Sequence, residues 1–259
     1  MTKVAEAAGY EPRGKGSVQK GKRIVLVGSG LSVGDATASA VTTQQLLPVG
    51  AVRHRIFLLS PANASGARAR LLLNATCATE LGLRLRDGGV RLGELFSFMS
   101  ALYFRGKLTY AQQFAAPPED LPGVLVITPS RGLLAPEQMI TLSDLEEMTR
   151  SQVDVEDMKY RGPLERDARL LLDRMKVATE VVLLGSVATP KYVEPLAAIF
   201  GERLVFPAEF LGRGDMSRGG LLLKCLREGV QLKYARIAGA QQGGKKRAGR
   251  AKAAKLTGA

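Results

Sequence analysis

The chain has 259 residues, of which 46% are hydrophobic, so it can form one sizeable core. A single histidine, His54, and two cysteines without a CxxC spacing argue against histidine-rich metal sites, most histidine-based catalytic triads and a disulfide framework. The net charge of +13 gathers at the two ends, because residues 1–23 carry +4 and residues 243–259 carry +6.

The two basic ends are expected to lie outside the folded core. Residues 1–22 and 237–259 contain too few apolar side chains to bury, which predicts disorder. We expect a single α/β domain over residues 23–236, in which residues 23–52 are either its first part or an extension before it. The C-terminal tail could hold a polyanion through counterion release, or it could be a solubilising segment without a specific partner.

A glycine-rich loop follows the first apolar run of the chain. Residues 24–27 lead into residues 28–34 (GSGLSVG), whose third glycine comes one residue late for the GxGxxG fingerprint of dinucleotide-binding proteins. The next apolar run ends at Ser60, where an acidic residue would be expected to hold a ribose. A structural turn is therefore favoured, and a nicotinamide-dependent enzyme that uses this loop is kept as an alternative.

Three further apolar runs each lead into a small polar loop, at residues 56–59, 124–127 and 181–184. Runs without polar alternation are typical of parallel strands that are covered on both faces. Helical patterns separate them, so the sequence predicts an α/β fold, a three-layer sandwich with a mostly parallel central sheet that is Rossmann-like. Ligands bind beyond the carboxyl ends of such strands, which makes the loops after the runs the expected site.

The segments between the runs are predicted to be helices. One helix is expected over residues 67–85, and two shorter ones over residues 94–102 and 110–114. A capping-box pattern starts another helix at Thr141, and Pro163 is expected to open a long one. The remaining expected elements are a helix that ends at Gly201, a strand over 203–206, a helix over 217–226 and a strand over 231–236.

Candidate ligand-binding residues come from the loops behind the three runs. Asn63 and its neighbours could bind an anion at a helix N-terminus, although capping alone would also explain them. The guanidinium of Arg131 suits a phosphate or a carboxylate, and a surface turn is the alternative. The residues predicted on this basis are Ser60, Asn63, Ser130, Arg131, Ser186 and Lys191.

The densest group of charged and small residues lies at positions 213–220. Arg213 and Arg218 could clamp an anion, and Asp215 between them could act as a base or bind a hydroxyl group. Asp215 is therefore the predicted catalytic residue if the protein is an enzyme. The alternative is a loop in which Asp215 pairs internally with an arginine.

Residues 55–145 resemble a pattern found in uncharacterised bacterial α/β proteins. The resemblance rests on LYFRG at 102–106, on Tyr110-Ala111 and on SRGLL at 130–134, where the last motif is one residue shorter than in that family. The family is distantly similar to the uracil-DNA-glycosylase-like fold, which implies an α/β architecture. The water-activating and histidine motifs of the glycosylases are absent, so glycosylase activity is not carried over.

These patterns together predict a cytoplasmic protein that binds a phosphate-bearing ligand, a nucleotide or a nucleic acid, at the carboxyl ends of the strands. No membrane partner is expected, because no apolar run reaches the length of a membrane span. No metal site is predicted, and the cofactor, if any, is not identified. A non-enzymatic nucleic-acid-associated module that uses the basic tail is the main alternative.

Overall fold

The computed structural model describes residues 54–237. The glycine-rich loop at 28–34, the N-terminal segment and the basic tail from 238 onward lie outside the described residues. Ile237, which the sequence placed at the start of the tail, is buried in a hydrophobic cluster of the core. Within the described residues, no helix is both long enough and apolar enough to span a membrane.

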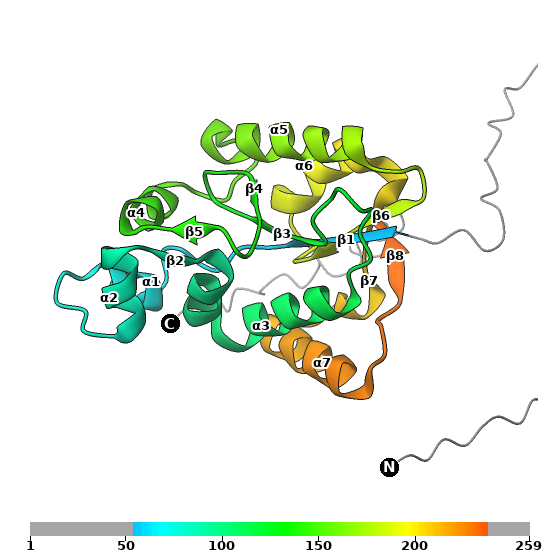
Figure 1. Ribbon diagram of the computed structural model, residues 1–259. Coiled ribbons are helices and arrows are strands. Elements are labelled where there is room, and N and C mark those ends of the chain that lie inside the picture. The colour runs from blue at the N-terminus through cyan, green and yellow to red at the C-terminus, as the bar shows by residue number, and fades with distance from the viewer. Residues whose placement is uncertain (1–53, 238–259) are drawn as a thin grey trace, which may run out of the picture. The chain divides into compact units, whose positions relative to one another are not determined.

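A six-stranded, mostly parallel sheet forms the centre of this region (Figure 1). Its strands, in the order in which they lie side by side, are β4 (Leu133–Leu134), β3 (Val124–Ile127), β1 (His54–Leu59), β6 (Thr179–Leu184), β7 (Leu204–Pro207) and β8 (Tyr234–Arg236). The edge strands β4 and β8 are antiparallel to their neighbours, and the others are parallel. The predicted α/β class with a mostly parallel sheet is confirmed.

The three uniformly apolar runs are the neighbouring strands β3, β1 and β6. Phe57 of β1 pairs with Val124 on one side and with Val182 on the other. Because successive side chains of a strand point to opposite faces, Phe57 and Ile56 belong to two different hydrophobic clusters. The chain passes from β1 to β3 on one side and then crosses to β6 on the other, so the strand order reverses between β1 and β6.

Two helices, α3 (Leu92–Phe114) and α7 (Asp215–Glu228), cover one face of the sheet (Figure 1). They approach closely where glycines face each other, since a Cβ on Gly219 would lie 3.3 Å from the Cα of Tyr103. Helix α3 is continuous over 23 residues, so the predicted break between two short helices is wrong. Within the segment between the two expected helices, Gly106 faces α7 and Lys107 is buried by tertiary contacts.

The opposite face is covered by α5 (Met158–Arg174) and α6 (Pro190–Phe200) (Figure 1). Tyr160 and Leu164 of α5 pack in the same cluster as Ile56 and Leu58 of β1. Helix α5 begins at Met158 rather than at Pro163, because Asp157 caps it by accepting a hydrogen bond from the backbone nitrogen of Lys159. Pro163 lies inside the helix.

The segment predicted as one helix over 67–85 forms two helices. They are α1 (Ala67–Leu73) and α2 (Glu80–Asp87). Asn74 accepts hydrogen bonds from Thr76, and Thr79 caps α2 by accepting one from the nitrogen of Gly82 at 3.2 Å. These local side-chain contacts compete with a continuous helix.

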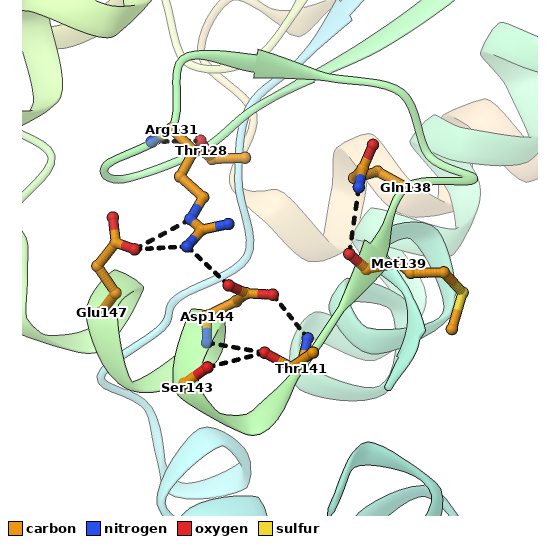
Figure 2. Close-up of polar contacts among 8 residues, drawn as sticks. All are labelled: Thr128, Arg131, Gln138, Met139, Thr141, Ser143, Asp144 and Glu147. Carbon is orange, nitrogen blue, oxygen red and sulfur yellow. Dashed lines mark hydrogen bonds and ion pairs between the residues drawn. The ribbon is translucent and has the colours of Figure 1, made fainter. Parts of the chain in front are cut away.

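The other predicted elements agree with the structure to within a few residues. Thr141 caps α4 through the expected capping box with Asp144 (Figure 2). The strand expected over 203–206 is β7 (Leu204–Pro207), and the helix expected over 217–226 is α7 (Asp215–Glu228). The other elements are β2 (Val90–Arg91), β5 (Met139–Ile140), α4 (Leu142–Arg150) and the short 3-10 helices η1 (Gly201–Arg203) and η2 (Ala208–Phe210).

Candidate functional site

A cavity of about 680 Å³ lies beyond the carboxyl ends of β1, β3 and β6. The loop at residues 60–65 after β1, Pro129 after β3 and Ser186 after β6 contribute to its lining. Side chains of α3, α6 and α7 and the end of α4 complete the walls. In open parallel sheets, the point where the strand order reverses is the usual ligand crevice, and this cavity lies there.

The structure gathers part of the predicted site residues around this cavity. Its lining includes Ser60, Asn63, Ser186, Lys191 and Asp215, which come from segments far apart in the sequence. The predicted residues that the described lining does not include are Ser130, Arg131, Arg213 and Arg218. The loops after the three strands therefore lie around one cavity, but four of the predicted side chains lie outside its described lining.

The guanidinium of Arg131 is held by two carboxylates of α4 (Figure 2). Its Nη2 lies 2.7 Å from Oε2 of Glu147 and 2.6 Å from Oδ1 of Asp144, and its Nε donates to Glu147 at 3.0 Å. The hydrogen bond with Glu147 raises the pKa of Arg131 and lowers that of the carboxyl. Because its charge is already compensated, we leave Arg131 out of the proposed ligand contacts.

We expect Arg131→Ala to lower the free energy of unfolding by about 1 kcal/mol at pH 7, the scale of a partly exposed ion pair. The pKa of Glu147 is lowered in the folded state, so this stabilisation is present above the unfolded carboxyl pKa of about 4.3 and is lost as the pH falls through the lowered folded value. Urea unfolding of the wild type and of Arg131→Ala at pH 7 and pH 3 measures this loss of free energy of unfolding. If the two proteins differ by the same free energy at both pH values, the expected pH dependence is contradicted.

The arginines around Asp215 make internal contacts. Asp215 lies 3.4 Å from Nη1 of Arg218, whose buried guanidinium also donates to the carbonyl oxygen of Phe210. Arg213 donates to the carbonyl of Glu209 and to the hydroxyl of Ser217. The internal pairing that the sequence left as an alternative is therefore present, while the Asp215 side chain, 71% exposed, still reaches the cavity lining.

Lys107, which the sequence patterns did not single out, is a buried lysine in contact with Ser60 and Tyr103 of the cavity lining. Its side chain is only 1% exposed, and Nζ donates to the carbonyl oxygen of Ser60 at 2.6 Å and lies 2.8 Å from the Ser60 hydroxyl. The rings of Tyr103 and Phe104 lie 4.6 and 5.0 Å from Nζ. In the described part of the chain, no carboxylate forms an ion pair with it.

Burial lowers the pKa of Lys107 to about 7, with Asp215 acting to raise it and Arg218 to lower it. Burial also raises the pKa of the neighbouring Tyr103 to about 12. One sequence signal could have found Lys107, because Tyr103, Lys107 and Tyr110 follow the spacing of an apolar helix face. A lysine within such a stripe is a candidate for burial.

The cavity has a polar lining with more basic than acidic groups. Arg150 and Lys191 are its basic residues in the described lining, and Asp215 is the acidic one. Among residues 54–237, no group of histidine, cysteine, aspartate and glutamate side chains is arranged to hold a metal ion. Comparisons with protein-family models, with curated proteins and with solved structures found no match to this chain.

Proposed function

We propose that the protein binds a phosphate-bearing ligand of nucleotide size in the cavity beyond β1, β3 and β6. The observation that carries this proposal is the position of a polar cavity of about 680 Å³, which is within the usual range for small-molecule sites, at the reversal of the strand order. We also infer a three-layer, Rossmann-like sandwich, supported by the two hydrophobic clusters on opposite faces of the sheet.

Lys191 and Arg150 are the groups proposed to meet the phosphate. Lys191 lies in the first turn of α6, where the helix dipole adds positive potential. Arg150 ends α4, on the other side of the lining, and its ion pair with Glu146 is exposed and therefore weak. A ligand phosphate can replace such a contact with charge-assisted hydrogen bonds.

Uncharged polar groups are proposed to hold the remainder of the ligand. Asn63 uses its side-chain oxygen to accept from the backbone and hydroxyl of Ser65, which leaves its amide nitrogen as a donor for a ligand. Ser186 accepts a hydrogen bond from the nitrogen of Ala188 and keeps its hydroxyl hydrogen. Sugar hydroxyls and base edges are suitable partners for both groups.

Titration of the full-length protein with AMP, ADP, GDP and pyrophosphate by calorimetry tests this function. We expect Lys191→Ala and Arg150→Ala each to weaken binding by about 10-fold to 100-fold, because each removes a charge-assisted hydrogen bond. Lys224→Ala is the matched control, since Lys224 is an exposed lysine of α7 outside the described lining.

Two results would contradict the proposal. One is that none of the four probes binds, and the other is that the cavity variants bind them like the control. Binding of an oligonucleotide that Lys191→Ala leaves unchanged would instead support the nucleic-acid-associated module that uses the basic tail.

A further inference from the structure

We propose that Ser60 is a nucleophile with Lys107 as its general base, and that the cavity hydrolyses a carboxylic ester of a phosphate-bearing molecule. The choice of substrate rests on the proposed function, whereas the assignment of the two residues does not. Ser60 directly follows the central strand β1, Lys107 lies in α3, the longest helix of the described region, and Nζ of Lys107 lies 2.8 Å from Oγ of Ser60.

The position of Ser60 is fixed at the end of the sheet. It directly follows β1, and its backbone nitrogen donates to the carbonyl oxygen of Leu184 on β6 at 3.1 Å. Gly185 follows β6 beside it, where a Cβ would lie only 3.0 Å from Cβ of Ser60. Ser60 is 6% exposed and belongs to the cavity lining, so a ligand in the cavity can meet its side chain.

Lys107 has the contacts that a proton acceptor for Ser60 requires. A neutral amine has two hydrogens and one lone pair, so it can donate to the carbonyl oxygen of Ser60 at 2.6 Å and accept from the hydroxyl. Burial favours this neutral form near pH 7. The aromatic rings of Tyr103 and Phe104 favour the ammonium once the proton has been taken up.

Ester hydrolysis then follows in two balanced steps. Oγ of Ser60 bonds to the carbonyl carbon while its proton moves to Nζ of Lys107, and the bond to the leaving alcohol breaks as Lys107 returns the proton to that oxygen. Water next attacks the acyl-serine and gives its proton to Lys107, which passes it to Ser60. The products are a carboxylic acid and an alcohol, and the serine and the lysine are regenerated.

A buried lysine that only caps the end of β1 is the alternative explanation of the same contacts. Such a lysine would donate a hydrogen bond to the carbonyl oxygen of Ser60 and would not make the Ser60 hydroxyl more reactive. The two explanations differ in the chemistry of Oγ, so a reagent that reacts with activated serines separates them.

The experiment treats the full-length protein with a fluorophosphonate and maps the adduct by mass spectrometry. We expect one adduct on Ser60, formed at a rate that rises with pH through about 7 as Lys107 loses its proton. Ser60→Ala should abolish the adduct, and Lys107→Met should slow its formation by about 100-fold or more, the usual contribution of a general base. Ser143→Ala, which removes an exposed serine of α4, should be labelled like the wild type.

Parallel assays with p-nitrophenyl acetate and p-nitrophenyl phosphate test the substrate class, and turnover of the acetate alone is expected. No adduct, an adduct elsewhere or turnover of the phosphate alone would overturn the proposal. If Lys107→Met does not fold, the mapped adduct on the wild type and its loss in Ser60→Ala still decide. Nucleotide binding without labelling would reject this dyad and leave the proposed function standing, and labelling without nucleotide binding would do the reverse.

Discussion

Lys107→Met should abolish a rise in stability of several kcal/mol that the wild type gains between pH 7 and pH 10. The pKa of Lys107 is about 7 in the folded protein, against about 10.4 for an unfolded lysine. Between these values the unfolded chain binds a proton that the folded chain has released, so the free energy of unfolding increases with pH. The full difference corresponds to roughly 5 kcal/mol, which is an upper bound.

Below pH 7 the lysine is protonated in both states, and the cost of its burial no longer changes with pH. The stability of Lys107→Met relative to the wild type, measured as the free energy of unfolding, should therefore be highest at pH 6 and lowest at pH 10. Asp215 and Arg218 are the charged groups that act on Lys107. Burial raises the pKa of Tyr103, whose ring lies 4.6 Å from Nζ, to about 12, so this phenol stays neutral in the folded protein over the same range.

Urea unfolding at pH 6, 8 and 10 provides the measurement. Lys224→Met is the matched control, because Lys224 is an exposed lysine whose removal should give a difference that is nearly independent of pH. A constant difference between Lys107→Met and the wild type would show that the lysine keeps an ordinary pKa in the folded state, and the general-base role of Lys107 would lose its support.

Gly132→Ala should lower the free energy of unfolding by about 3 kcal/mol, the sum expected from left-handed backbone strain and steric overlap. Gly132 has a φ of +66°, and a Cβ there would lie 2.1 Å from Oδ2 of Asp167 and 2.6 Å from the carbonyl oxygen of Pro163. Asp167 cannot move freely, because the same oxygen accepts a hydrogen bond from the nitrogen of Leu133 at 3.0 Å. The β3–β4 turn would have to shift away from α5.

Gly212→Ala is the control for the backbone term. Gly212 also has a positive φ, of +71°, but a Cβ there would have no neighbour within 4 Å. We expect a loss of only about 1 kcal/mol from the left-handed conformation alone. Chemical denaturation of the two variants separates strain from overlap, and equal losses would contradict the steric argument.

The candidate site illustrates how far local sequence signals reach. A polar loop after an apolar strand is a local pattern, and it placed Ser60, Ser186 and their neighbours around the cavity. Arg131 fits the same pattern, but the two acidic side chains that neutralise it come from a helix that follows later in the chain. No local pattern states which arginine is already paired, so the sequence could not separate it from Lys191.

The sequence by itself determined the α/β class and its three central strands, because uniformly apolar runs such as Ile56–Leu59 that alternate with helical patterns are typical of parallel strands covered on both faces. Only the tertiary structure decided that α3 continues through Gly106, since the helix α7 packs against that glycine. It also decided that Lys107 meets Ser60. These two residues are separated by α1, α2, β2 and the first part of α3, and packing of the whole core brings them together and sets both the burial of the amine and its pKa.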